Sequence, residues 1–245
     1  MPRFFIDKKH IENDSLYITG DDARHIARSL RMAVGDEITV CDGEGYEYLS
    51  SLTKIRDDRC DCEIIRKSLS SHEPKSKITL FMAYPKSDKL ETIIQKAVEL
   101  GVTKIVPFES SRCIKKPKAE KATEKTARLQ RIADEAAKQC GRAILPKVSL
   151  PIDYKEAVKL ASNHSLAIFC YEGKGTKSLK EILDGTKDTP ESISVVVGSE
   201  GGFSKEEADI AAEAGILLAN LGPRILRCET APDYCLSAIS YRFEL

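Results

Sequence analysis

The sequence lacks net charge, long apolar runs and a secretory signal, and each absence excludes a class of protein. It carries 38 Lys and Arg against 38 Asp and Glu, so any nucleic-acid site must be a local patch. The longest apolar runs are about six residues, far short of the ~20 that a transmembrane helix needs. The opening MPRFFIDKKH has charged residues too early for the apolar segment of a signal peptide. A cytoplasmic protein without membrane contact is therefore expected.

The eight cysteines are scattered along the chain and predict no metal site. Their one close pair is Cys60-Asp61-Cys62, and neither a CxxC pair nor a Cys/His quartet with zinc-binding spacing occurs. Unpaired thiols in a reducing compartment are therefore expected, and no metal cofactor is expected.

The first 70 residues predict a small β-barrel with one short helix. They contain short alternating apolar runs separated by turns of glycine and aspartate, which is typical of strands. The runs lie at 15–19, 37–41, 46–55 and 61–66. Residues 22–31 fit a helix that carries Arg24, Arg28 and Arg31. These arginines either contact RNA phosphates or are solvated charges on a helix surface.

After a polar linker at 70–77, strand-like and helix-like segments alternate along the rest of the chain. This alternation predicts the α/β class, with a mostly parallel sheet covered by helices on both faces. The expected strands are 78–83, 103–108, 166–171, 192–197 and 217–221. The expected helices are 88–100, 155–161, 179–183, one from Ser204 and one over 229–243. Asp88 and Glu91 are expected to cap the first of these helices.

Residues 112–142 form a basic stretch in this otherwise neutral chain. They contain ten Lys and Arg against four Asp and Glu, an excess of six positive charges. Apolar residues recur at helical spacing from Leu129 to Cys140, which predicts a helix with a core side and a charged side. A charge run is usually a solvated face, but this one-signed excess favours a patch that contacts RNA phosphates. Its predicted RNA contacts are Arg112, Lys115, Lys116 and Lys118.

The stretch 195–231 holds two glycine-bearing turns, each following a short apolar run. The first, at 198–202, follows a β-branched strand, and Gly201-Gly202 allow a bulky group close to the backbone. Residues 204–207, Ser-Lys-Glu-Glu, then fit a capping box that starts a helix. A ligand here would meet backbone N–H groups at two adjacent strand ends, where open α/β sheets bind small molecules. The first turn matches neither a P-loop nor a GxGxxG motif.

Two motifs in this stretch are specific enough to indicate a family. GSEGGFS at 198–204 resembles the GPEGG(F/L)S loop of the RsmE family, and LGPRILRCETA at 221–231 resembles its LG-x-RILR-x-ETA segment. Further similarity runs along nearly the whole chain. Ser199 stands where the family usually has proline, and Cys228 where it often has threonine. This family belongs to the SPOUT superfamily and methylates N3 of a uridine in 16S ribosomal RNA.

The resemblance implies a SPOUT-type, trefoil-knotted methyltransferase domain over 75–245 and a PUA-like RNA-binding β-barrel over 1–70. It also implies S-adenosyl-L-methionine as the cofactor, and 16S ribosomal RNA within the assembled small subunit as the partner. Enzymes of this family are homodimers through the region of the final helix. The N3 atom lies on the Watson–Crick edge, so the target uridine must be unpaired or flipped out.

By the same resemblance, the two turns surround the cofactor. The implied cofactor-binding residues are Gly198, Glu200, Gly201, Gly202, Leu221, Gly222, Ile225, Leu226 and Arg227. Glu200 either binds the ribose or only holds its loop. Arg227 is the expected catalytic cation that stabilises the uridine anion, with Arg224 next. Glu229 accepts the N3 proton, orients Arg227 or forms a purely structural pair with it, and no motif identifies a general base.

Two alternatives stay open at this point. One is a SPOUT enzyme that modifies a ribose 2′-hydroxyl of tRNA or ribosomal RNA, and the match to the N-terminal barrel argues against it. The other is a non-catalytic RNA-binding ribosome-assembly factor that has lost its cofactor. The intact glycines at 198, 201, 202 and 222 argue against that reading. The sequence therefore favours the uridine N3-methyltransferase.

Overall fold

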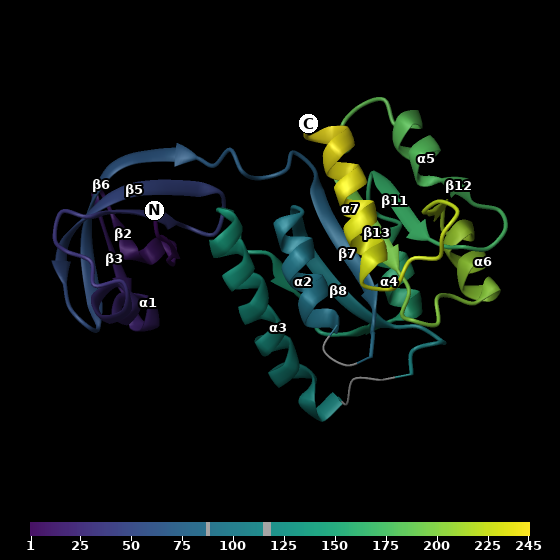
Figure 1. The fold of residues 1–245 in the computed structure, drawn as a ribbon, viewed down its shortest axis with the longest axis horizontal. Coiled ribbons are helices and arrows are strands. Elements are labelled where there is room, and N and C mark those ends of the chain that lie inside the picture. Colours follow the sequence, from purple (N-terminus) through teal and green to yellow (C-terminus); the bar gives the residue numbers. More distant parts are fainter. Residues whose placement is uncertain (87–88, 115–118) are drawn as a thin grey trace. The chain divides into compact units, whose positions relative to one another are not determined.

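The computed structural model describes residues 1–86, 89–114 and 119–245, which form two compact units (Figure 1). The first unit consists of Met1–Glu73 together with Ala137–Leu145. The second consists of Pro74–Ala136 together with Pro146–Leu245. The first boundary lies inside the segment that composition predicts to be a linker.

The first unit is built on a six-stranded sheet in the order β1-β4-β5-β6-β3-β2. Neighbouring strands are antiparallel except β1 and β4, which are parallel. The strands are β1 Arg3–Phe5, β2 Ile11–Glu12, β3 Ser15–Thr19, β4 Glu37–Cys41, β5 Tyr46–Ile55 and β6 Arg59–Leu69. The predictions for β3, β4 and β5 are confirmed, β6 is longer than predicted, and β1 and β2 are additions. A 3-10 turn, Lys8–His10, precedes β2.

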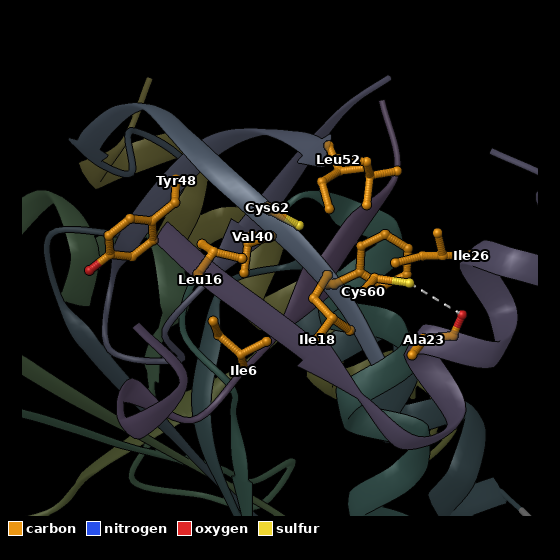
Figure 2. Packing of buried hydrophobic residues seen from close by; sticks show 12 residues of the cluster. Ile6, Leu16, Ile18, Ala23, Ile26, Val40, Tyr48, Leu52, Cys60 and Cys62 are labelled. Atoms are coloured by element: carbon orange, nitrogen blue, oxygen red, sulfur yellow. Dashed lines mark hydrogen bonds between the residues drawn. The ribbon is translucent and has the colours of Figure 1, made fainter. Parts of the chain in front are cut away.

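Apolar side chains of this unit form one buried cluster (Figure 2). Leu16 and Ile18 are buried while their neighbours on β3 are exposed or half-buried, as strand alternation requires. Ala23 and Ile26 join the cluster from the helical segment, and the Cys60 thiol donates to the Ala23 carbonyl at 3.8 Å (Figure 2). The core is therefore shared between the sheet and one helical segment.

That helical segment differs from the predicted helix at 22–31. The α-helix is α1 Gly20–Arg24, and it continues as a π-helical turn over His25–Ser29. The segment ends at Ser29, and Arg31, two residues later, has a positive φ of 51° that side-chain-bearing residues seldom adopt. The helix is confirmed, but it runs from Gly20 to Ser29 and not over 22–31, and helical spacing in the sequence does not distinguish the wider π turn from an α turn.

The second unit contains a sheet in the order β10-β8-β7-β13-β11-β14-β12, with β9 paired to β8. Every strand pair that the structure describes in it is parallel, which confirms the predicted mostly parallel sheet. Its strands are β7 Lys77–Ala83, β8 Val102–Glu109, β9 Lys147–Val148, β10 Ile152–Asp153, β11 Leu166–Cys170, β12 Lys177–Ser178, β13 Ser192–Val197 and β14 Leu217–Asn220. Its helical segments are α2 Lys89–Glu99, α3 Ala119–Cys140, α4 Tyr154–Ala161, α5 Leu179–Gly185, α6 Lys205–Glu213 and α7 Thr230–Phe243. The last residues of α3 belong to the first unit.

Local capping fixes where the helix after the first glycine turn begins. The Ser204 hydroxyl accepts from the Glu207 N–H at 3.2 Å, and the Glu207 carboxylate accepts from the Ser204 N–H at 2.9 Å. This reciprocal pair is the predicted capping box, and it orients the chain as it leaves the turn. Asp88, the predicted cap of α2, lies outside the described residues.

Helix α7 lies beside α2 in the second unit (Figure 1). Helical spacing places Ala231, Tyr234, Cys235, Ala238 and Ile239 on one side of this helix, and the sequence predicts that a partner subunit covers its apolar stripe. In the structure Ala231, Cys235 and Ile239 are already buried within the subunit, whereas Tyr234 is 48% exposed. Residues three and four apart share a broad helix face, and only the neighbouring elements decide which part of that face is covered.

Two further findings concern membrane-spanning helices and metal sites, neither of which the sequence predicts. In the part of the chain that the structure describes, no helix combines the length and apolar character needed to cross a membrane. The same residues contain no group of three His, Cys, Asp or Glu that could hold a metal ion. All eight cysteines are unpaired.

Candidate functional site

A pocket of about 570 Å³ lies at the carboxyl ends of three adjacent strands of the second unit. Strand β13 lies between β7 and β11, and β11 pairs with β14, so the ends of β11, β13 and β14 meet at one edge. The lining comes from 170–172, 197–200, Gly202 and 220–228, and Lys89 of α2 and Ala231 of α7 complete it. This is the strand-end location that the sequence predicts.

The first predicted turn forms one wall of the pocket. Gly202 has a positive φ of 61°, and its N–H donates to the Ser199 carbonyl at 2.9 Å, which closes a tight turn. A Cβ atom on Gly202 would lie 3.0 Å from the Glu172 carboxylate. A Cβ atom on Gly198 would lie 3.0 Å from the Gly202 Cα atom. Both glycines are therefore required by the backbone of the pocket itself.

Gly201 differs from its neighbours because it does not line the pocket. Its carbonyl accepts from the Arg112 guanidinium at 3.1 Å, and a Cβ atom there would lie 3.0 Å from Arg112 Cβ. The Ser199 hydroxyl donates to the Arg112 carbonyl at 3.4 Å. Arg112, predicted as an RNA contact, thus also holds the glycine turn from outside the pocket.

The second predicted turn forms the opposite wall. All of its predicted cofactor and catalytic residues line the pocket, namely Leu221, Gly222, Arg224, Ile225, Leu226 and Arg227. Gly222 has a positive φ of 102°, which suits glycine. The Arg224 and Arg227 side chains are exposed, and none of the described residues forms an ion pair with either guanidinium.

Glu229 does not pair with Arg227, so that structural interpretation is wrong. Its carboxylate accepts from the Lys89 ammonium at 3.1 Å, and Lys89 also forms an ion pair with Glu200 at 3.2 Å. Glu200 further accepts from the Lys86 backbone N–H at 3.1 and 3.2 Å. Lys89 therefore joins the glycine turn to the start of α7.

The pKa shifts of Lys89, Glu200 and Glu229 follow from these contacts. Hydrogen bonds to Glu229 and then Glu200 raise the pKa of Lys89, so its ammonium stays charged. Burial raises the pKa of each of the two carboxyl groups, but their hydrogen bonds outweigh burial and hold both pKa values below the usual range. Lys89 and both glutamates are therefore ionised at neutral pH.

Cys228, beside Glu229, stays a thiol. Burial, followed by its hydrogen bond to Glu229, raises the pKa of Cys228 to about 12. The thiol donates to the Glu229 carboxylate at 3.2 Å. The same sulfur accepts from the Lys89 ammonium at 3.9 Å, so Cys228 contacts both members of the Lys89–Glu229 ion pair.

Comparison with known proteins agrees with this geometry. Residues 72–240 match the RNA methyltransferase domain family, and residues 18–65 match the RNA methyltransferase PUA domain family. The chain is 35% identical over 251 residues to ribosomal RNA small subunit methyltransferase E of Bacillus subtilis, covering 100% of this chain and 98% of the relative. The chain belongs to the ribosomal RNA small subunit methyltransferase E family.

Two further matches in the methyltransferase E family cover almost the full length of both chains. The Mesomycoplasma hyopneumoniae enzyme is 32% identical, with 97% of this chain and 98% of the relative covered. A solved structure from Neisseria gonorrhoeae, bound to S-adenosyl methionine, is 33% identical with a TM-score of 0.85. That match covers 98% of this chain and 97% of the other. The predicted family is confirmed, together with the α/β fold and the PUA-like unit.

Several pocket residues of this methyltransferase E family member were not predicted. Lys89, Tyr171, Glu172 and Asn220 all line the pocket. Tyr171, Glu172 and Asn220 sit where predicted strands end, so the strand-end rule could have indicated them. Lys89 is the first described residue of α2, the helix that follows β7, and no local motif identifies it.

Two of the three predicted RNA contacts of the PUA-like unit form ion pairs within that unit. Arg24 forms an ion pair with Asp21 at 2.9 Å, and Arg28 forms a close ion pair with Asp57. Arg31 is exposed. Lys115, Lys116 and Lys118 lie outside the described residues.

Proposed function

We propose that the protein transfers a methyl group from S-adenosyl-L-methionine to N3 of a uridine in 16S ribosomal RNA of the small subunit. The strand-end pocket carries this proposal. Its volume of about 570 Å³ falls in the usual range of small-molecule sites, roughly 300–1,000 Å³. The glycine turn and the 221–227 turn that line it are the two segments that resemble the family's cofactor loops.

The charges in the pocket fit the chemistry of this transfer. Uridine N3 must lose its proton, and a fixed cation stabilises the anion that develops. Arg227 lines the pocket without an ionic partner among the described residues, so its charge is available. Glu229 has a lowered pKa, which favours a role as the counter-ion of Lys89 over a role as a base. Alignment of N3 with the sulfonium methyl supplies much of the remaining rate.

We assign RNA recognition to the PUA-like unit, with Arg24, Arg28 and Arg31, and to the basic stretch that begins at Arg112. The proposed substrate is 16S ribosomal RNA in the assembled subunit. A protein that acts on this substrate works in the cytoplasm. The SPOUT-type trefoil knot belongs to the same proposal. Strands β13 and β14, which the two turns follow, flank β11 in the sheet, and this strand order supports it.

Mapping the methylated nucleotide by mass spectrometry tests this function. Ribosomal RNA from cells that lack the protein is incubated, as free RNA and as small subunits, with enzyme and labelled S-adenosylmethionine. The proposal expects the label on a uracil base at N3. A label on a ribose 2′-hydroxyl would support the other SPOUT activity. No label, with no calorimetric binding of S-adenosylmethionine, would support the assembly factor.

Reversing the charge of Lys115, Lys116 and Lys118 to Glu should weaken RNA binding and flatten its salt dependence. Each lost phosphate contact lowers the slope of log affinity against log salt by roughly 0.7 to 0.9. The measurement is a filter-binding titration at several salt concentrations. A matched variant with Lys155, Lys159 and Lys180 reversed controls for net charge alone. An equal slope in both variants would mean that the stretch is a solvated face.

The exposed face of α7 supports a homodimer. Tyr234 is 48% exposed and Tyr241 is 76% exposed, with half-buried Ala238 between them at helical spacing. Exposed aromatic residues in a row on one helix are typical of an interaction surface. A two-fold contact between identical surfaces is the commonest arrangement for soluble oligomers.

The substitution Ala238→Arg should therefore give a folded monomer without methyltransferase activity. An arginine in the centre of the α7 contact would be buried without a counter-charge. Light scattering beside a methylation assay measures both effects. Ala212→Arg, at an exposed alanine of α6, is the control and should stay dimeric and active. A monomeric wild type, or a fully active monomeric variant, would contradict the proposal.

A further inference from the structure

We propose that Lys89 is a positioning residue that fixes the two walls of the pocket at the spacing S-adenosylmethionine needs. This inference rests on the proposed function, because it concerns affinity for that cofactor. Lys89 is the first described residue of α2, and its side chain lines the pocket. Its ammonium contacts Glu200 of the glycine turn and Glu229 at the start of α7.

The helix that carries this lysine is firmly packed. The residues that follow it on α2, Leu90, Ile93, Ile94, Ala97 and Val98, are buried. Helix α2 packs against both β8 and α7. The Lys89 ammonium therefore extends from a fixed helix toward two segments that are loops or helix ends, and such segments have the most freedom to move.

Two carboxylates share this one cation. Glu200 and Glu229 lie at 3.2 and 3.1 Å from the Lys89 ammonium, and their side chains are 27% and 26% exposed. Without the lysine, two ionised groups would face each other in a partly desolvated site, where like charges repel strongly. Among the residues that the structure describes, no other cation forms an ion pair with both carboxylates, so the attraction that joins the glycine turn to the start of α7 would be lost.

A second ion pair between α2 and α7 provides a matched comparison. Lys96 contacts Asp233 at 2.9 Å, so it also ties α2 to the beginning of α7. Neither residue lines the pocket. A role in attaching the two helices would be shared by both lysines, whereas a role in spacing the pocket walls belongs to Lys89 alone.

Calorimetry with S-adenosylmethionine on Lys89→Met, Lys89→Arg and Lys96→Met distinguishes these roles, with thermal unfolding measured on each variant. For Lys89→Met we expect about tenfold weaker binding, or ~1.4 kcal/mol. Lys89→Arg keeps the charge and can pair with both carboxylates, so it should bind within about threefold of wild type. Lys96→Met should bind as the wild type does, even where its unfolding temperature falls.

Equal affinity of Lys89→Met and wild type would overturn the inference. An equal loss in Lys96→Met, or a loss in Lys89→Arg as large as in Lys89→Met, would do the same, because helix attachment or the lysine shape would then explain the effect. A wild type that binds no S-adenosylmethionine would overturn the proposed function itself, and this inference with it.

Discussion

Gly202→Val should abolish S-adenosylmethionine binding and leave a folded protein. Gly202 has a positive φ of 61°, and valine is strained there by ~1–3 kcal/mol because its branched Cβ contacts the backbone. The new Cβ would also lie 3.0 Å from the Glu172 carboxylate, so this exposed side chain would have to shift, and the positive φ at Gly202 is the main strain on the turn. The turn and Glu172 both line the pocket, and the cofactor would lose one wall.

Gly215→Val is the matched control for this prediction. Gly215 also has a positive φ, 83°, but a Cβ there would meet no atom within 4 Å, and the residue does not line the pocket. Both variants should lose similar thermal stability, whereas only Gly202→Val should lose heat of binding in calorimetry. Wild-type affinity in folded Gly202→Val would mean that the turn is not part of the cofactor site.

The parts of the site that were predicted from the sequence are formed by residues close together in the chain. The glycines of the first turn, the capping box at Ser204 and the apolar strands before each turn act within a few residues of each other, so pattern is enough to find them. Parallel strands then bring their carboxyl ends to one edge, which explains why two turns about 20 residues apart share one pocket.

The contacts of Lys89 with Glu200 and Glu229 could not be predicted in this way. Lys89 and Glu229 are 140 positions apart, and a lysine near the start of a helix carries no signal for distant carboxylates. The same reasoning applies to the α7 face, where Tyr234 and Cys235 fit one apolar stripe but only Cys235 is covered. The additional strands β1 and β2, at three and two residues, are too short for alternation to indicate them.

Because Lys89 is paired with Glu229 and Glu200, Arg227 and Arg224 are the pocket cations available to the substrate, and Arg227 lies closer in the sequence to Glu229. Glu229 is occupied by Lys89, so Arg227 keeps its full charge inside the pocket rather than sharing it with a neighbouring carboxylate. An unpaired cation stabilises a developing anion more than one already neutralised, because no counter-ion has to be displaced.

Arg227→Met should therefore lower the methyl-transfer rate by about 100-fold or more, the loss typical when one stabilising donor is removed from an active site. Affinity for S-adenosylmethionine should change much less, since the cofactor's sulfonium is itself a cation. Single-turnover kinetics at saturating cofactor separate the two effects, and Arg227→Lys should recover part of the rate by keeping the charge. Arg224→Met, in the same turn, is the matched control. If Arg224→Met loses more rate than Arg227→Met, then Arg224 is the cation that faces the uridine, and Arg227 only lines the cofactor.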